Sequence, residues 1–373
     1  MSRRGNKANF VIIAAGQMIS LFGSAIQRFC MSLYVLDLTG SPGIFATILS
    51  ISMLPYVLLA PVAGNITDYF SKKKIMVCTD IFSGIVISCY AAFLFSGHDR
   101  PAVIAVTMIL LSAASTIYSP AVTASIPLSV SAKQLYRANG IVQQIGSAAN
   151  FAGPVIAGML YGFLGIRWIV VLNAISFFVS ALMEGFLHLP EKKNGSRNKL
   201  SFLGSVNEMY QGFLYLKKFQ SIILKIIFSY GLSNLFIVPV FSVAAPHFIK
   251  NVLGLSSEVY GSVEGITVLG MITGGVLISV FPKRFSMAVI HRVLSLGLFN
   301  VISLTYMQQA VPGSMIGKTS AFSTAAATAT IPPGQFLFGQ ILESGISVPV
   351  LFLFVSAASL GTAYFVKQAI KKN

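Results

Sequence analysis

Charged residues are scarce in this 373-residue chain, and acidic residues are scarcer still. Only 10% of the residues are charged, whereas soluble domains carry about 25%. A chain with 55% hydrophobic residues and a mean hydropathy of +0.79 cannot cover a surface that faces water. Most of its exterior must therefore face lipid, which excludes an ordinary soluble globular protein.

Cysteine and histidine are also rare, with three and four residues. Cys30, Cys78 and Cys89 lie within or beside apolar runs, and their odd number argues against a disulfide framework. The histidines are scattered without metal-ligand spacing, and no phosphate-binding Gly-x-x-x-x-Gly-Lys-Ser/Thr loop is present. No arrangement of a nucleophile with its base is visible either. We therefore expect no metal, no cofactor and no enzymatic activity.

The charge that is present is mostly positive, with 26 lysines and arginines against 10 acidic residues. A basic protein can bind nucleic acid, but no basic patch here is interleaved with the aromatic residues that base stacking needs. The basic residues lie in short segments between apolar runs, which is the pattern of cytoplasmic loops in membrane proteins. We therefore expect a lipid bilayer as the partner and no nucleic acid.

A membrane-spanning helix needs about 20 mostly apolar residues, and the chain contains about eleven such stretches. The first run, from Phe10 to Leu36, is too long for the core of a signal peptide, so we read it as a retained span. The predicted spans are 10–36, 42–66, 75–96, 101–124, 139–165, 168–188, 220–248, 257–281, 286–308, 318–341 and 346–366.

A basic segment separates the first six predicted spans from the rest. We therefore expect a six-helix bundle at 1–188, a basic cytoplasmic linker at 189–219 with an amphipathic part, and a second bundle at 220–373. The whole is predicted to be an all-α polytopic membrane protein with two bundles.

The two halves are predicted to be parallel repeats, as in many transporters. An offset of 211 residues places Gly64 on Gly275, and an offset of 181 places Arg137 on Lys318. The offset falls by 30 residues between these landmarks. The second half therefore has room for about one helix fewer, and the shortening lies at 285–310.

The distribution of basic residues predicts the orientation in the membrane. Arg3, Arg4 and Lys7 precede the first span, and Lys72–Lys74 follow the second. We therefore expect a multi-pass plasma-membrane protein with a cytoplasmic N-terminus. Eleven spans would place Lys318 outside, so either the 286–308 segment does not cross the bilayer or the chain has lost a helix.

The loop after the second predicted span reads Gly64-Asn-Ile-Thr-Asp68-Tyr-Phe-Ser-Lys72-Lys73-Lys74. It resembles the loop signature of the major facilitator superfamily, Gly-x-x-x-Asp-x-x-Gly-Arg/Lys-Arg/Lys, although Ser71 replaces the second glycine. The alternative is an ordinary basic loop. The resemblance implies a conformational lock, in which Gly64, Asp68, Lys72 and Lys73 meet the start of the penultimate span near Lys318.

A second stretch resembles the Gly-Pro-x-x-Gly motif of exporters in this superfamily. Its small or polar residues and its proline lie in the fifth predicted span, at Gly146, Asn150, Gly153, Pro154 and Gly158. Small residues allow helices to approach closely, and proline bends a helix, so simple packing is the alternative interpretation. The motif favours export over import.

Further stretches resemble the branch that contains macrolide-efflux proteins and siderophore exporters. These stretches are Leu33–Pro42, Leu135–Gly140, Tyr260–Gly265 and Pro333–Gly339. The resemblance covers nearly the whole chain outside 285–310. It implies the major facilitator fold and efflux of a small molecule.

Ionisable residues within predicted spans are candidates for coupling or substrate contact, and these are Glu264, Arg28, Asp37 and Asp80. Glu264 lies well inside its span and is flanked by small residues, so we expect it to hold a proton or a cationic substrate; the alternative is a structural partner for Arg28 or another base. Asp80 and Glu184 lie close to span ends, where we expect them to reach toward the membrane surface or to have structural roles.

These observations predict a monomeric secondary active transporter. We expect it to export an amphipathic drug or macrolide-like molecule by alternating access. Because the sequence contains an exporter-type motif and no nucleotide-binding loop, we expect the export to be driven by exchange for protons. The alternative is a non-transporting remnant or membrane scaffold that has lost one helix. A channel is disfavoured because no filter-like repeat is present.

Overall fold

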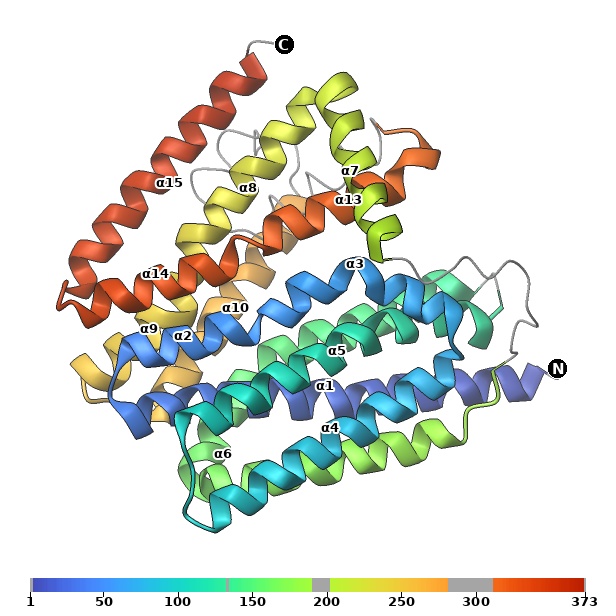
Figure 1. Cartoon of the computed structure of the whole chain (residues 1–373), viewed down its shortest axis with the longest axis horizontal. Helices are drawn as coiled ribbons and strands as arrows, with labels where there is room; N and C mark the ends of the chain where they lie inside the picture. The colour runs from blue at the N-terminus through green and yellow to red at the C-terminus, as the bar shows by residue number, and fades with distance from the viewer. Residues whose placement is uncertain (1–2, 132–133, 190–201, 281–310, 372–373) are drawn as a thin grey trace. The chain divides into compact units, whose positions relative to one another are not determined.

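The computed structural model describes residues 3–131, 134–189, 202–280 and 311–371, and all regular elements in these ranges are helices (Figure 1). Six stretches within them are long and apolar enough to cross a membrane. Helices suit this setting because they satisfy every backbone polar group internally. The all-α fold is confirmed. The predicted span at 286–308 lies outside the described residues, so the total of about eleven spans stays a prediction.

The helices of the first half are α1 (Arg3–Thr39), α2 (Pro42–Ser52), α3 (Leu54–Tyr69), α4 (Lys72–Phe95), α5 (Pro101–Ser129) and α6 (Leu135–Gly185). Those of the second half are α7 (Phe202–Phe219), α8 (Ser221–Pro239), α9 (Ala245–His247), α10 (Ser257–Val280), α13 (Gly313–Thr328), α14 (Ile331–Glu343) and α15 (Val348–Lys371). Two π-helical turns, Val240–Ala244 and Phe248–Val252, flank α9 and extend the α8 rod.

Two prolines lie at the starts of helices, and one glycine interrupts a long helix. Pro55 lies in the first turn of α3 and Pro332 in the first turn of α14, positions where the missing N–H costs nothing. Gly165 interrupts α6 with φ 68° and ψ 169°, a conformation that side chains with a Cβ rarely adopt. The two arms of α6 correspond to the predicted spans at 139–165 and 168–188.

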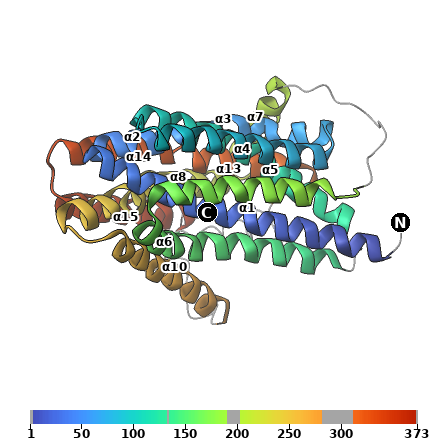
Figure 2. The same ribbon diagram turned by 90° about the horizontal axis from the view of Figure 1, so that it is seen from below.

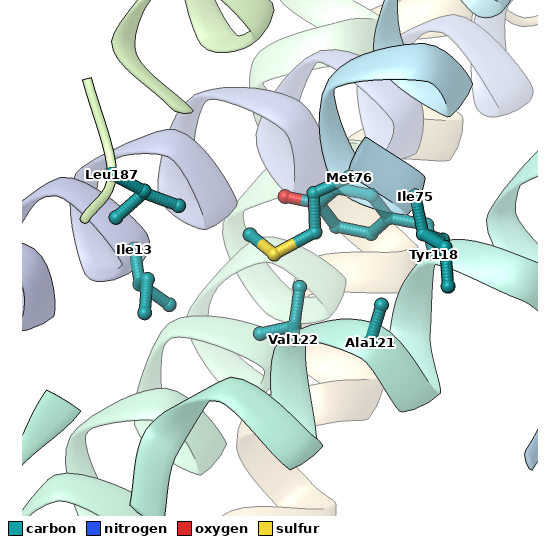
Figure 3. Close-up of a cluster of buried hydrophobic side chains, with 7 residues drawn as sticks. All are labelled: Ile13, Ile75, Met76, Tyr118, Ala121, Val122 and Leu187. Atoms are coloured by element: carbon teal, nitrogen blue, oxygen red, sulfur yellow. The ribbon is translucent and has the colours of Figure 1, made fainter. Parts of the chain in front are cut away.

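The chain divides into two compact units, of which the first contains the described residues of 1–39, 52–201 and 255–265. Its helices α1, α4, α5 and α6 lie side by side (Figures 1 and 2). α1 packs along α6, and α4 packs on both α5 and α6. Their core includes a cluster of buried side chains from α1, α4 and α5 and from Leu187, which follows α6 (Figure 3).

The second unit contains the described residues of 40–51, 202–254 and 266–373. Within it, α8 packs on α14 and α15, and α13 packs on α7 and α8. The short helix α2 also belongs here, because its Ser50 hydroxyl donates to the Pro332 carbonyl oxygen at 2.6 Å. The predicted domain limits at 1–188, 189–219 and 220–373 stay predictions.

Candidate functional site

Glu264 lies in α10 next to two aromatic rings of the first unit. The Tyr260 hydroxyl donates to Oε1 of Glu264 at 3.1 Å, and the Tyr260 ring stacks on Phe29 of α1 with centroids 5.1 Å apart. The side chain of Glu264 is half-buried. A carboxylate beside stacked rings can hold a proton or attract an organic cation.

The other predicted charged candidates do not join Glu264. Arg28 is exposed on α1, and among the described residues no hydrogen bond or ion pair links it to Glu264. Asp37 lies near the end of α1, where its Oδ2 accepts a hydrogen bond of 2.8 Å from the Tyr161 hydroxyl. The structure thus brings together Glu264 with aromatic residues, rather than with the predicted basic partner.

Asp80 and Glu184 are the clearest departure from expectation. Neither reaches toward the membrane surface, because their exposed fractions are only 2% and 0%. The Tyr118 hydroxyl donates to Oε1 of Glu184 at 2.6 Å, and Ser20 donates to Oδ1 of Asp80 at 3.5 Å. Four packed helices enclose both carboxyl groups, which contradicts the expectation that they reach toward the membrane surface and leaves the other expectation, a structural role, as a prediction. Their position near span ends was a poor guide because it says nothing about neighbouring helices.

The exporter-type motif lies on the faces of α6 that approach α1 and α10. A Cβ added to Gly153 would lie 2.8 Å from Cβ of Ala25 on α1. A Cβ added to Gly158 would lie 2.8 Å from the Ser257 carbonyl oxygen and 3.1 Å from Cα of Gly261 on α10. Glycine is therefore required at both positions for close helix packing.

The other members of the motif behave differently. An added Cβ at Gly146 meets no described atom within 4 Å. Gly162, which lies outside the motif and one helical turn after Gly158, faces the carboxyl group of Glu258 on α10. The side chain of Asn150 lies outside the described residues. The motif therefore combines a tight α6–α10 seam with positions that have no packing role in the described structure.

The Gly64–Lys74 segment joins α3 to α4. α3 ends at Tyr69, Phe70 is extended, and α4 begins at Lys72, so Lys72 and Lys73 occupy the first turn of a helix. The side chain of Asp68 is outside the described part of the chain. In the second unit, Lys318 donates to Oε1 of Gln211 at 2.5 Å. The lock between this loop and Lys318 stays a prediction.

Glu343 was not identified as a candidate residue from the sequence. Glu343, at the end of α14, accepts hydrogen bonds from the Ser41 hydroxyl at 2.7 Å and the Gly43 N–H at 2.9 Å. The Gly43 N–H, followed by the Ser41 hydroxyl, holds the pKa of Glu343 below its ordinary value. The carboxylate thus caps the start of α2. A serine just before a helix was the available signal, but it does not reveal a partner 300 residues away in sequence.

The packed helices that are long and apolar enough to cross a bilayer define a class, that of polytopic α-helical membrane proteins. The sequence profile of the Major Facilitator Superfamily matches residues 13–366, and the chain belongs to that family. The predicted family is therefore confirmed, and membership places the chain among transporters rather than enzymes. It is a multi-pass membrane protein.

Efflux proteins are among the sequence relatives, which confirms the resemblance to that branch. Macrolide efflux protein A of Streptococcus pyogenes is 26% identical over 216 residues, which are 57% of this chain and 52% of that protein. The multidrug efflux pump Tap of Mycobacterium bovis is 25% identical over 193 residues, or 50% of this chain and 46% of the pump. The alignments thus span about half the length of these relatives.

Solved structures show the same fold. The nucleoside transporter NupG has a TM-score of 0.71 at 13% identity, covering 97% of this chain and 99% of that one. The D-xylose-proton symporter has a TM-score of 0.64 at 13% identity, covering 96% of each chain. At such low identity, these similarities show the fold alone.

Proposed function

We propose that the chain is a secondary active exporter that carries an amphipathic small molecule, such as a macrolide, out of the cell in exchange for protons. The two bundles would expose the substrate site alternately to the two faces of the membrane. The observation that carries the proposal is the kinship with efflux proteins, macrolide efflux protein A and Tap, along the aligned half of the chain.

The surroundings of Glu264 support an amphipathic substrate. The Phe29–Tyr260 stack offers apolar ring faces, and the neighbouring carboxyl group offers a negative charge or a proton. A molecule with an apolar body and a basic amine matches both features. We assign Glu264 as a substrate or coupling residue on this basis.

The orientation belongs to the same proposal. The basic residues around the α3–α4 junction, Lys72–Lys74, favour the cytoplasmic side, as do Arg3, Arg4 and Lys7 near the N-terminus. We place the protein in the plasma membrane as a monomer with its N-terminus inside. Single cysteines introduced beside Lys74 should then resist a membrane-impermeant thiol reagent in intact cells, and labelling there would contradict this orientation.

The test of export is accumulation of radiolabelled erythromycin in bacterial cells that lack their own efflux pumps. Cells that express the chain should accumulate less of the drug, and a protonophore should abolish the difference. Glu264→Gln should reduce efflux at least several-fold and flatten its pH dependence, because the amide keeps the shape but cannot ionise.

Glu208→Gln supplies the matched control, since Glu208 is exposed on α7. It should leave efflux unchanged. Protonophore-resistant efflux would refute proton exchange, and unchanged efflux with Glu264→Gln would refute the role of that residue. If erythromycin and other amphipathic drugs all fail to be exported, the alternative of a non-transporting remnant is favoured.

A further inference from the structure

We propose that Asp80 and Glu184 hold a proton between them, as a buried carboxyl pair inside the first unit and apart from Glu264. The pair is a protonation site of the N-terminal helices themselves. Its use in transport rests on the proposed function, whereas the presence of the proton does not.

The pair lies where four helices meet. Asp80 comes from α4, Glu184 from α6, Tyr118 from α5 and Ser20 from α1. Gly16 and Ser20 lie one turn apart on the same face of α1, and Glu184 contacts the first while Asp80 contacts the second, so the two carboxyl groups enter the same part of the core. Gly16 of α1 leaves room for them, since an added Cβ there would lie 3.4 Å from Oε1 of Glu184.

Each carboxyl group has one oxygen that is paired and one that is not. The Tyr118 hydroxyl donates a hydrogen bond to Oε1 of Glu184, and the Ser20 hydroxyl donates one to Oδ1 of Asp80. Oδ2 of Asp80 and Oε2 of Glu184 are buried without a hydrogen-bond partner. Buried polar atoms are rarely left in this state, so the unpaired oxygens point to a missing hydrogen.

The residues that surround the pair also favour a bound proton. α5 contributes Tyr118, α1 contributes Ser20 and Gly16, and α6 adds Ser180. Within the described ranges, no lysine, arginine or histidine is bonded to either carboxyl group. Two neighbouring buried anions without a cation would be very costly, and a bound proton removes one charge and supplies the missing donor.

An apolar cluster closes one side of the pair, one helical turn away. Met76 precedes Asp80 by four residues, and Leu187 follows Glu184 by three. Ile13, Met76, Val122 and Leu187 are buried and pack together in the same cluster as the Tyr118 ring (Figure 3). Among the described residues, this side of the pair is therefore lined by apolar side chains.

The opposite direction along the α1–α6 seam is polar. Ser176 donates to Oδ1 of Asn173 at 3.0 Å, and Nδ2 of Asn173 donates to Oε1 of Gln27. An added Cβ at Gly23 would collide with Asn173 and Ser176, so glycine lets these side chains fill the seam. The described part of the α1–α6 seam is therefore polar on this side of the pair.

Infrared difference spectroscopy of the purified protein in lipid vesicles tests the proposal directly. Spectra recorded between acidic and alkaline buffer, in H2O and in D2O, should contain a protonated-carboxyl band that shifts on deuteration. Asp80→Asn and Glu184→Gln should each change this band, and the double variant should abolish it. A double variant with the wild-type band would overturn the proposal.

Three further measurements keep the result interpretable. Glu208→Gln should leave the band unchanged, because its carboxyl group is exposed. If the double variant does not fold, Tyr118→Phe removes only the donor to Glu184 and should shift the band; an unshifted band would contradict the pair. Replacing choline with sodium in the buffer should have no effect, and loss of the band with sodium would assign the pair to a metal cation instead.

This experiment separates the proposal from the proposed function because it uses no transported substrate. A band that depends on both carboxyl groups supports the pair even if erythromycin is not exported. Normal proton-dependent efflux without such a band would refute the pair and leave the exporter proposal intact.

Discussion

Gly158→Ala tests whether the exporter-type motif is a close-packed seam. In the first unit, Gly158 of α6 faces the start of α10, where backbone atoms of Ser257 and Gly261 surround it. The new methyl group would lie 2.8 Å from the Ser257 carbonyl oxygen, inside contact distance. Because that neighbour is backbone, it cannot rotate away, and the two helices must move apart.

The magnitude follows from a comparison with Gly146→Ala in the same helix. Both changes gain helix propensity of about 0.5–1 kcal/mol, and this gain cancels between the two variants. An alanine at 146 meets no described atom within 4 Å, whereas forcing a methyl group into a filled contact costs about 1–3 kcal/mol. Gly158→Ala should therefore be less stable than Gly146→Ala by about 1–3 kcal/mol.

The assay is thermal unfolding of both variants and the wild type in the same detergent, alongside erythromycin accumulation in cells. Gly146→Ala should melt at or slightly above the wild-type temperature, and Gly158→Ala clearly below the Gly146 variant. Efflux should be impaired by Gly158→Ala alone. Equal melting temperatures for the two variants would refute the close-packed seam.

Three other predictions address packing and pH. Asn173→Leu should destabilise the first unit by about 1–3 kcal/mol in thermal melts, because Gln27 loses its buried partner, and adding Gln27→Leu should restore part of the loss. Gly212→Val should loosen α7 from α13, where the added side chain meets backbone, and should speed proteolysis after α7, whereas a protease-resistant variant would contradict the contact. The hydrogen bond from the Gly43 N–H lowers the pKa of Glu343 from its ordinary 4.5. The contact therefore stabilises the protein above that pH, and the stabilisation is lost on acidification. Glu343→Gln should remove this part of the acid sensitivity in thermal melts recorded at several pH values.

The sequence was a good guide where the information is local. The bilayer demands long apolar stretches, so the runs that became α1, α4 and α5 could be located by hydropathy alone. Glycine spacing likewise identified the α6 motif as a packing surface, although not which helix it faces. The predicted lock at Asp68 and the span at 286–308 remain predictions, because that side chain and that segment lie outside the described residues.

The partners of buried polar groups could not be read from the sequence. Tyr118 and Glu184 are 66 residues apart in sequence, and Gly43 and Glu343 are 300 apart, yet each pair is hydrogen-bonded. Position near a span end even misled the interpretation of Asp80 and Glu184, because burial depends on the neighbouring helices. Composition and the apolar runs thus determined by themselves that this chain is a helical membrane protein, since lipid acts on each segment separately, and the short motifs carried the resemblance to a transporter family. Only the tertiary structure decided which of these distant side chains are hydrogen-bonded, since those contacts arise when distant helices pack.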